Sequence, residues 1–466
     1  MFIGRNKELD LLEELYESDR FEFLVMYGRR RVGKTSLLQE FSKKHTCIFF
    51  SAQEKNDSLN LLDFSKTVQN YFDHSFFAQF SDWEAALRYI TEKSGDNKLL
   101  LIIDEFPFIA ESNPSIKSIL QHTIDHVWKE KNIKLILCGS SVSFMENEVM
   151  GYKSPLYGRS TSQIEIQPFD YYDSARFFPQ YTNLEKLFAY GILGGIPCYL
   201  QAFDGSISIP RNIEMNILRT GAFLKEETQL LLKMELREPA IYNSIFEAIA
   251  SGASRMNDIS TKIHEEMQKC SKYINTLRTL KLITKKSPCG EKEITRKTIY
   301  RISDNFFAFW YRFLFTNRSY YELLGAKDAS EEIFDSEEFS TYMGPIFEDI
   351  CKEYMLRLAR QRFLPFIPYQ IGKWWGNNPL RKANDDIDIL LVDKSEEEYI
   401  LCECKFKNEE FGKPEYETLL ERASIFPNAK KIHFYAFSKS GFSSWVQEHA
   451  TDDHVTLIDI DQLFEI

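Results

Sequence analysis

The chain has 466 residues, of which 44% are hydrophobic, and a formal net charge of -12 at pH 7. This length predicts about three domains, and the hydrophobic content is sufficient to give each of them a core. The acidic balance argues against a protein that binds nucleic acid over its whole surface.

A phosphate-binding loop is predicted near the N-terminus. Residues 23–26 form an apolar run typical of a buried strand, and residues 28–35 then read G-x-x-x-x-G-K-T before a helical pattern begins. The glycines allow backbone N–H groups to point at a triphosphate, Lys34 adds a charge for its β- and γ-phosphates, and Thr35 provides a hydroxyl ligand for Mg²⁺. The predicted nucleotide-binding residues are Gly28, Arg29, Arg30, Arg31, Val32, Gly33, Lys34, Thr35 and Ser36.

An acidic pair follows the apolar run 99–103, which is typical of a parallel strand covered on both faces. Asp104 is placed to serve the Mg²⁺ ion, and Glu105 to orient and deprotonate the attacking water. Such a pair about 70 residues after a phosphate loop predicts nucleotide hydrolysis.

Two further residues are candidates for contact with the γ-phosphate. Ser140 follows the strand-like run 133–138 and is the candidate sensor of the phosphate or of the attacking water. Arg159 could reach the γ-phosphate of its own site or of a neighbouring subunit's site. Strands alternate with helices over residues 1–167, which predicts an α/β fold with a parallel sheet.

The rest of the chain divides into four predicted segments. Residues 168–238 have helical patterns and are interpreted as a small helical lid. Residues 239–303 have the helix and strand order of a winged helix-turn-helix. Residues 304–338 are an aromatic segment followed by an acidic linker, and residues 339–466 return to an α/β pattern.

The predicted winged helix-turn-helix carries a local excess of positive charge. Between residues 269 and 301 ten basic residues stand against two acidic ones. This balance favours DNA as a partner, with the third helix in the major groove and basic residues on phosphates. A winged helix used only for protein contact remains an alternative. The basic residues are Lys269, Lys272, Arg278, Lys281, Lys285, Lys286, Lys292, Arg296, Lys297 and Arg301.

A second chemical pattern lies in the last segment. Glu348 is predicted on a helix, Asp388 on a strand, and Glu403 with Lys405 on the next strand. Residues two apart in a strand share a face, so Glu403 and Lys405 project together. The three carboxylates could hold Mg²⁺ against a scissile phosphate while Lys405 stabilises the attacking hydroxide, as in metal-dependent nucleases. A nuclease-like fold that binds without cutting is the alternative.

The cysteines and apolar runs indicate where the chain functions. Eight cysteines without a Cys-x-x-Cys pair favour reduced thiols in a cytoplasmic protein over a disulfide scaffold or a zinc site. The first three residues are followed at once by the run Gly-Arg-Asn-Lys-Glu at 4–8, so no leader peptide is expected. No apolar run approaches the roughly 20 residues that a bilayer requires, so no membrane partner is expected.

At this level the chain resembles the archaeal-type P-loop ATPases of the AAA+/STAND group, over essentially all of its length. The resemblance is carried by residues 2–5, 27–35, 103–106, 139–141, 155–159, 194–197 and 304–313, and in the last segment by residues 347–348, 374–375, 387–389 and 403–405. It implies ATP as the nucleotide, Arg159 as a phosphate-contacting arginine and residues 194–197 as the hinge of the lid. It also implies a nuclease-like C-terminal domain.

Three hypotheses follow from these patterns. The first is an Mg²⁺-dependent ATPase whose nucleotide state repositions a winged helix and a nuclease-like domain on DNA. The second is an ATP-dependent regulatory switch with a catalytically silent C-terminal domain. The third is a nucleotide-dependent scaffold for protein partners. A homo-oligomer is compatible with each of them.

Overall fold

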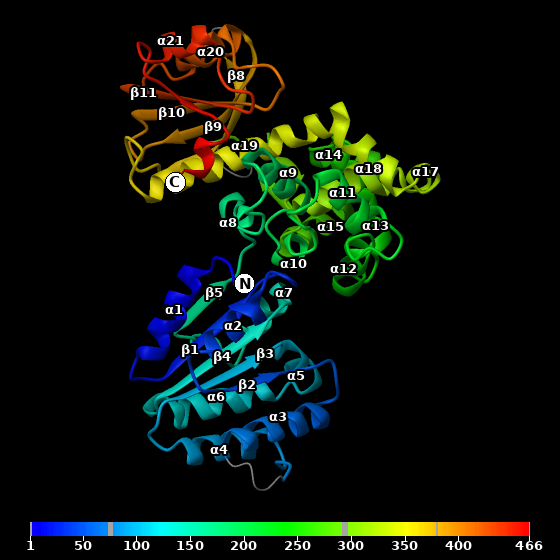
Figure 1. Cartoon of the computed structure of the whole chain (residues 1–466). Coiled ribbons are helices and arrows are strands. Elements are labelled where there is room, and N and C mark those ends of the chain that lie inside the picture. The colour runs from blue at the N-terminus through cyan, green and yellow to red at the C-terminus, as the bar shows by residue number, and fades with distance from the viewer. Residues whose placement is uncertain (1, 73–77, 291–296, 379–380, 466) are drawn as a thin grey trace. The chain divides into compact units, whose positions relative to one another are not determined.

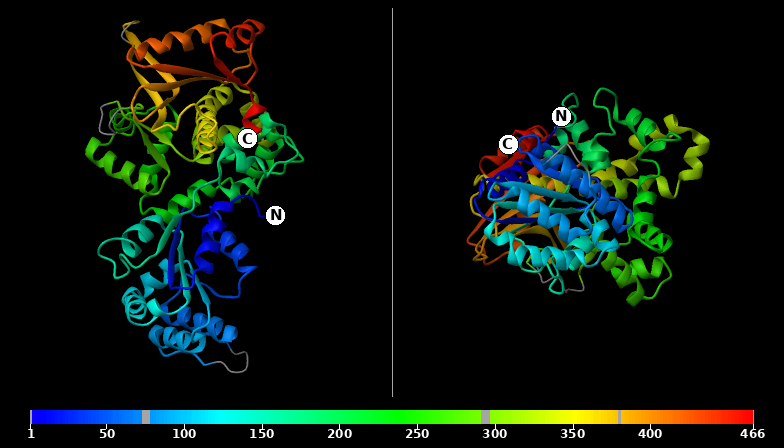
Figure 2. Two further views of the ribbon diagram at one scale, coloured as in Figure 1. Left: turned by 90° about the vertical axis from the view of Figure 1, so that its left-hand side faces the viewer. Right: turned by 90° about the horizontal axis from the view of Figure 1, so that it is seen from below.

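The computed structural model describes residues 2–72, 78–290, 297–378 and 381–465. The chain forms two units, drawn in Figure 1 and from two further directions in Figure 2. Unit 1 consists of residues 1–168 and 196–198, and unit 2 consists of residues 169–195 and 199–466. The segments that the sequence analysis separates beyond residue 238 all belong to unit 2.

A five-stranded parallel sheet lies at the centre of unit 1, with the strand order β2-β3-β4-β1-β5. The predicted parallel α/β core is therefore confirmed. Because all strands run in one direction, the segments that follow them meet at one edge of the sheet. The strands are β1 (Glu22–Tyr27), β2 (Cys47–Ser51), β3 (Leu99–Asp104), β4 (Ile133–Gly139) and β5 (Ser162–Glu165).

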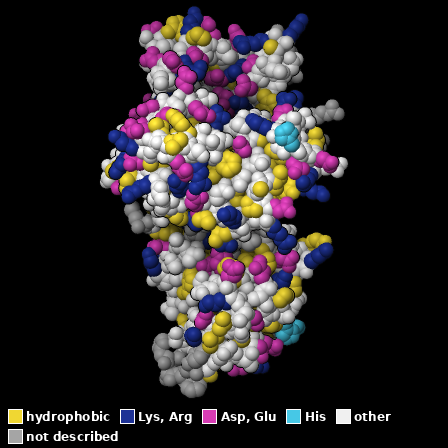
Figure 3. Space-filling view, turned by 90° about the vertical axis from the view of Figure 1, so that its right-hand side faces the viewer, with side chains coloured by type: hydrophobic (Ala, Val, Ile, Leu, Met, Phe, Trp, Pro, Cys, Tyr) yellow, Lys and Arg dark blue, Asp and Glu magenta, His cyan; other side chains and the backbone are white. Residues whose placement is uncertain are grey.

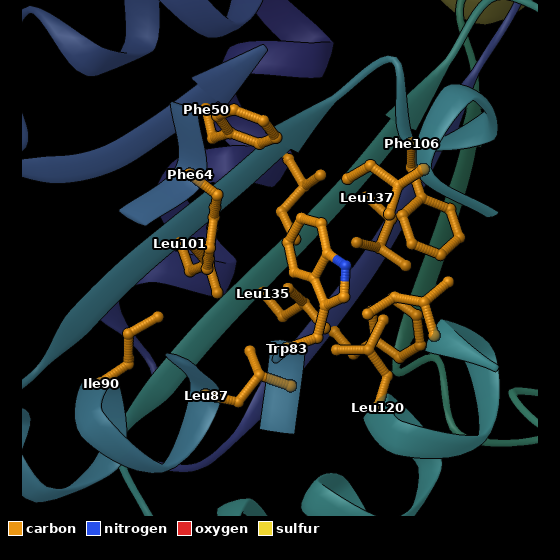
Figure 4. Packing of buried hydrophobic residues seen from close by; sticks show 14 of the residues in the cluster. Phe50, Phe64, Trp83, Leu87, Ile90, Leu101, Phe106, Leu120, Leu135 and Leu137 are labelled. Carbon is orange, nitrogen blue, oxygen red and sulfur yellow. The ribbon is translucent and has the colours of Figure 1, made fainter. Parts of the chain in front are cut away.

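Apolar side chains pack against both faces of this sheet, because successive residues of a strand point to opposite sides. On one face, Phe23 belongs to a cluster of buried apolar residues. Figure 4 shows part of this cluster, including Trp83 and Leu120. Leu24 instead lies with Leu12 and Phe41 on the opposite side. The helical segments of unit 1 are α1 (Asn6–Glu17), α2 (Lys34–Ser42), α3 (Asp57–Phe72), α4 (Trp83–Ser94), α5 (Phe106–Ser112), α6 (Ile116–His126), η1 (Trp128–Glu130), α7 (Val142–Phe144) and the π-helical η2 (Met145–Val149).

The first part of unit 2 is helical. Two of its segments, η3 and η4, are π-helices that directly continue α11 and α16. The segments are α8 (Tyr171–Ala175), α9 (Asn183–Leu193), α10 (Pro197–Leu200, which begins in unit 1), α11 (Ile209–Ile213), η3 (Glu214–Leu218), α12 (Glu227–Glu235), α16 (Asn305–Phe309), η4 (Trp310–Phe315), α17 (Arg318–Leu324), α18 (Ala326–Asp335) and α19 (Glu337–Arg360).

Between α12 and α16 the chain forms three helices and then a two-stranded antiparallel sheet. The elements are α13 (Pro239–Ala250), α14 (Met256–Lys262), α15 (Met267–Thr279), β6 (Ile283–Lys286) and β7 (Ile299–Ile302). On α15 the buried side chains are Cys270, Ile274 and Leu277. Lys292 and Arg296, counted in the basic excess of the sequence, lie outside the described residues.

The end of the chain forms a mixed five-stranded sheet with the order β12-β11-β10-β9-β8. β10 runs parallel to β11 and antiparallel to β9, and its apolar core is separate from that of unit 1. The elements are β8 (Gln370–Asn378), β9 (Ala383–Val392), β10 (Glu398–Lys405), α20 (Lys413–Glu421), η5 (Arg422–Ile425), β11 (Lys431–Ser438), α21 (Ser444–Ala450), β12 (Val455–Ile458) and η6 (Gln462–Phe464).

The residues predicted as an acidic linker are helical. They form α18 and the first turn of α19. Ile333 is buried, and the Ser336 side chain accepts a hydrogen bond from the backbone N–H of Phe339 at the start of α19. Acidic residues are favourable in the first turn of a helix, so their presence did not signal a linker. Among the described residues, no helix is both long and apolar enough to cross a membrane.

Candidate functional site

The predicted phosphate loop connects β1 to the start of α2. Gly28 has φ 151°, and a Cβ atom there would approach the carbonyl oxygen of Ile166 to 2.5 Å, so only glycine fits. Gly33 has φ 96° and directly precedes α2, whose N-terminal N–H groups face outward from the helix end. The loop therefore has the backbone conformation that brings N–H donors together at a helix N-terminus, as phosphate binding requires.

Lys34 lies at the base of this loop with only 5% of its surface exposed. Its Nζ atom donates hydrogen bonds to the carbonyl oxygens of Gly28 at 2.8 Å and Arg29 at 3.0 Å. Burial lowers the pKa of Lys34, and the charges of Glu105 and Asp104 partly oppose this effect. The ammonium group thus spans the loop that would surround a triphosphate.

The acidic pair lies at the end of β3, next to the loop. The Thr35 hydroxyl donates a hydrogen bond to Asp104 Oδ2 at 2.7 Å, and Asp104 is 1% exposed. One hydroxyl and one carboxylate oxygen therefore lie together, and both are oxygen ligands of the type that Mg²⁺ prefers. These two residues are therefore the ones that would hold an Mg²⁺ ion bound with a nucleotide.

Glu105 and Ser140 are hydrogen-bonded to each other. Glu105 Oε2 accepts a bond from the Ser140 hydroxyl at 2.9 Å and one from the Ser140 backbone N–H at 3.2 Å. Glu105 also adopts a left-handed backbone conformation with φ 53°, which costs of the order of 1 kcal/mol for a residue other than glycine. Strain of this kind persists where the surroundings hold a side chain in a particular position.

Arg159 is not directed to this group of residues. Its Nη2 atom is 2.6 Å from Asp125 Oδ2, and its Nη1 atom donates to the carbonyl oxygens of Pro155 and Tyr157. The bond from Arg159 is the main reason why the pKa of Asp125 is lowered. The structure therefore brings five of the predicted residues together, namely Lys34, Thr35, Asp104, Glu105 and Ser140. Arg159 is instead bound to Asp125 of α6. The other predicted loop residues, Arg30, Arg31, Val32 and Ser36, lie in the loop or at the start of α2.

Two of the predicted C-terminal carboxylates, Glu348 and Asp388, lie around a lysine that the sequence pattern does not single out. Lys373 Nζ, from β8, is 3.0 Å from both Glu348 carboxylate oxygens and 3.0 Å from Asp388 Oδ1. It is also 3.1 Å from Asp386 Oδ2. Asp388 Oδ2 accepts a further bond from the Cys404 backbone N–H at 2.9 Å. We call Glu348, Asp385, Asp386, Asp388 and Glu403, with Lys373 and Arg422, the acidic cluster.

A second cation holds the remaining predicted ligand. Arg422 of η5 pairs with Glu403 and, at 3.1 Å, with Asp385 Oδ1. Lys405, predicted beside the reacting phosphate, instead binds Glu415 Oε1 at 2.6 Å and the Glu410 carbonyl oxygen at 2.9 Å. Burial, followed by the charge of Asp388, raises the pKa of Glu348 and that of Glu403 to about 7.

This arrangement does not fit the predicted C-terminal metal. Within the described ranges, no group of three or more His, Cys, Asp or Glu residues is placed to hold a metal ion. The ammonium of Lys373 and the guanidinium of Arg422 contact the oxygens of Glu348, Asp388 and Glu403 that the sequence analysis assigned to Mg²⁺. Neither cation could be recognised from sequence spacing, because each comes from a different element.

Comparisons with known proteins bear on both regions. Residues 2–203 match a family described as an ATPase domain predominantly from Archaea. Residues 310–419 match a family described as archaeal and bacterial proteins of unknown function. An uncharacterized protein of Methanocaldococcus jannaschii is 33% identical over 414 residues, which is 88% of each chain. An uncharacterized ATP-binding protein of the same organism is 44% identical over 41 residues, 9% of this chain and 70% of that one.

A solved structure shares the fold. The Walker-type ATPase of Pyrococcus abyssi matches 67% of this chain and 96% of its own, with a TM-score of 0.52 and 21% sequence identity.

Proposed function

The chain belongs to the family of ATPases found predominantly in Archaea, and we propose that its ATP hydrolysis works as a switch controlling DNA binding. The observation that carries this proposal is the position of the catalytic groups at one edge of the parallel sheet. Thr35 is hydrogen-bonded to Asp104, and Glu105 is hydrogen-bonded to Ser140. In this proposal the first pair holds the metal ion and the second pair contains the base, both next to the phosphate loop.

In the proposed mechanism, Lys34 exchanges the loop carbonyls for the β- and γ-phosphate oxygens of ATP. Thr35 and Asp104 would hold Mg²⁺, and the ion would neutralise charge on the phosphates. Because Ser140 holds Oε2 of Glu105, Oε1 is the atom that receives the proton of the attacking water. Ser140 is thus a positioning residue for the base.

The test is ATP hydrolysis by Glu105→Gln and Ser140→Ala. Glu105→Gln keeps the shape of the side chain but removes the base, so we expect hydrolysis to fall about 100-fold or more while ATP binding persists. In Ser140→Ala hydrolysis should fall less, because the Glu105 carboxylate loses the hydrogen bond from the hydroxyl but keeps the one from the backbone N–H. Hydrolysis by Glu105→Gln at the wild-type rate would refute the assignment of the base.

The DNA-binding part of the proposal rests on α15. The elements α13 to β7 follow the order of a winged helix-turn-helix, in which the third helix enters the major groove. Lys269 and Lys272 of α15 are exposed. Lys286 of β6 and Arg301 of β7, in contrast, each lie 2.7 Å from Asp349 of α19. We therefore propose contact through α15 rather than through the strands.

The charge distribution limits how widely DNA could bind. Figure 3 shows Lys and Arg side chains interspersed with Asp and Glu on the face that it draws. We expect binding that is local and strongly weakened by salt. Lys272→Glu should reduce affinity for duplex DNA at low salt, whereas Lys394→Glu, at an exposed turn between β9 and β10, should not. Equal affinity with ATP and with ADP would contradict the switch, and equal affinity of both variants would contradict the role of α15.

In the C-terminal domain, two basic side chains contact the carboxylates of the acidic cluster. This arrangement favours a domain without nuclease activity. We propose that it does not cut DNA, because Lys373 and Arg422 take the positions next to the carboxylates that a metal ion would need. Supercoiled plasmid incubated with the protein, Mg²⁺ and ATP should remain intact with wild type and with Glu403→Ala. Nicking by wild type that disappears in Glu403→Ala would reverse this conclusion.

A further inference from the structure

A cavity of about 500 Å³ lies in the helical part of unit 2. This volume is within the range of roughly 300–1,000 Å³ that is typical of small-molecule sites. Its lining residues belong neither to the phosphate loop nor to the acidic cluster, so the proposed ATPase mechanism does not account for it.

Two π-helical segments form the apolar part of the cavity. Ile217 and Leu218 come from η3, and Trp310 and Leu314 come from η4. In η3 the backbone N–H of Arg219 donates to the Glu214 carbonyl oxygen at 2.9 Å, the wider spacing of a π-helix. π-Helices are rare, and they frequently occur at functional sites.

A hydrogen bond joins two parts of the cavity lining, the indole of Trp310 and the backbone of Lys225. The Trp310 indole Nε1 donates a hydrogen bond to the Lys225 carbonyl oxygen at 3.0 Å. Trp310 itself is only 4% exposed. The indole ring and the segment that carries Lys225 are therefore held together before any ligand arrives, and preorganisation of this kind favours binding.

The polar part of the cavity is positively charged. Arg219, Lys225 and Arg318 contribute to its lining, together with the single acid Glu322. Arg318 pairs with Glu226 at 2.6 Å and with Glu322 at 3.4 Å. Neither Arg219 nor Lys225 has an acidic partner among the residues that the structure describes. Two basic side chains thus remain at the edge of an apolar cavity without a compensating charge.

Tyr321 adds a hydrogen-bond donor to the same lining. Burial, followed by the charge of Glu332, raises the pKa of the Tyr321 hydroxyl to about 12. The hydroxyl therefore keeps its proton at neutral pH and can donate a bond to a negatively charged oxygen.

We propose that this cavity binds a small organic anion with an apolar body. The aliphatic or aromatic body lies against Trp310 and Leu314, and the anionic group meets Arg219 and Lys225. Burial of the body provides most of the affinity, while the two cations select an anion over a neutral molecule of the same shape. Carboxylates, sulfonates and phosphates share this chemistry.

The experiment is a titration of the full chain with the fluorescent arylsulfonate ANS, followed by competition. Decanoate, decyl phosphate and decanol share one apolar chain and differ in the head group. We expect both anions to displace ANS and decanol to do so at least about ten-fold less well. Whichever anion competes better identifies the preferred head group. Displacement by decanol at the same concentration as the anions would overturn the proposed selectivity.

Two variants locate the binding. Arg219→Glu reverses an exposed charge at the edge of the cavity, and we expect about ten-fold weaker anion binding. The matched control is Arg237→Glu, an exposed arginine that does not line the cavity. Ala326→Phe places a ring in the cavity and should abolish competition by both anions, and the melting curve and ATP hydrolysis of this variant report whether it folds. Wild-type anion binding by Arg219→Glu would show that ANS binds elsewhere and would refute the proposal.

Discussion

Unit 1 and the C-terminal domain both carry a group of carboxylates. The two groups differ in the kind of side chain that donates hydrogen bonds to the carboxylate oxygens. In unit 1, Asp104 and Glu105 accept bonds from the hydroxyls of Thr35 and Ser140. In the acidic cluster, Glu348, Asp388 and Glu403 are bound by two full positive charges. A hydroxyl can donate to a carboxylate and still coordinate a metal, whereas an ammonium or guanidinium group neutralises the carboxylate.

This difference shows what strand spacing can and cannot predict. Spacing places side chains two apart in a strand on a common face, as it does for Asp386 and Asp388, which both contact Lys373. It does not identify the partners that come from other elements. A carboxylate pattern therefore predicts a metal site only when the residues around it leave the carboxylate oxygens to the metal.

The largest expected effect distinguishes the two regions directly. Lys34→Ala removes the charge that spans the phosphate loop, so we expect ATP hydrolysis to fall by about 100-fold or more. Lys43→Ala, which removes an exposed lysine at the end of the same helix, should hydrolyse ATP like wild type. A steady-state assay of released phosphate makes the measurement. Equal rates for the two variants would show that the loop does not hold ATP as proposed.

Lys373→Met tests the acidic cluster through stability rather than activity. The variant leaves the carboxylates of Glu348 and Asp388 without their shared cation. Because Lys373 is partly exposed, we expect a loss of about 1–3 kcal/mol in the free energy of unfolding, less than for a fully buried pair.

Chemical denaturation measures this loss, with Lys394→Met at an exposed turn as the control. The measurement is repeated with added Mg²⁺. If Mg²⁺ stabilises wild type and the control but stabilises Glu403→Ala much less, the cluster binds metal and our contrast between the regions is lost.

The pH dependence of stability provides a third comparison. Burial and Asp388 raise the pKa of Glu348 to about 7, well above the value of about 4.3 in the unfolded chain. Between these values the folded state binds more protons, so stability should fall as pH rises through the window and level off above it. Glu348→Gln should make this fall smaller, and Glu396→Gln, at an exposed turn, should not change it. Melting temperatures that rise with pH in both variants and wild type would contradict the protonation of Glu348.

Arg159→Ala should have the smallest effect. The Arg159–Asp125 ion pair is partly exposed, so its loss should cost about 0.5–1 kcal/mol in stability. We expect ATP hydrolysis to decrease much less than in Lys34→Ala, because Arg159 is bound to Asp125. A decrease as large as that of Lys34→Ala would mean that Arg159 leaves Asp125 to contact the phosphates during the reaction.

The strand, loop and helix around the nucleotide site could be predicted because they are local in sequence. The apolar runs, the two glycines and the lysine follow one another directly, and parallel strands bring their ends together. Glu105 and Ser140 meet because β3 and β4 are neighbours in the sheet. The hydrogen bond between these two side chains, by contrast, depends on the backbone conformation of Glu105, which no sequence pattern signals.

Other features depend on contacts that are distant in sequence. Lys373 and Arg422 could not be assigned to the acidic cluster without the pairing of β8 with β9 and the position of η5. On α15 the spacing of Tyr273, Leu277 and Leu280 in the sequence would predict one inner face, whereas Cys270 and Ile274 are the buried residues beside Leu277. Tyr273 is instead oriented toward Glu238, with which it forms a hydrogen bond. A tyrosine has an apolar ring and a polar hydroxyl, so its position in a helix does not identify the buried face reliably.

Helix α19 connects two charge networks through adjacent residues. Glu348 contacts Lys373 of the C-terminal sheet, and Asp349 contacts Lys286 and Arg301 of the β6–β7 hairpin. Consecutive helical residues project about 100° apart, so one turn of a single rod faces two neighbours. An axial twist of that rod by even a fraction of a turn would strain both sets of ion pairs together. Ion pairs therefore join both the hairpin and the sheet to adjacent positions of one helix.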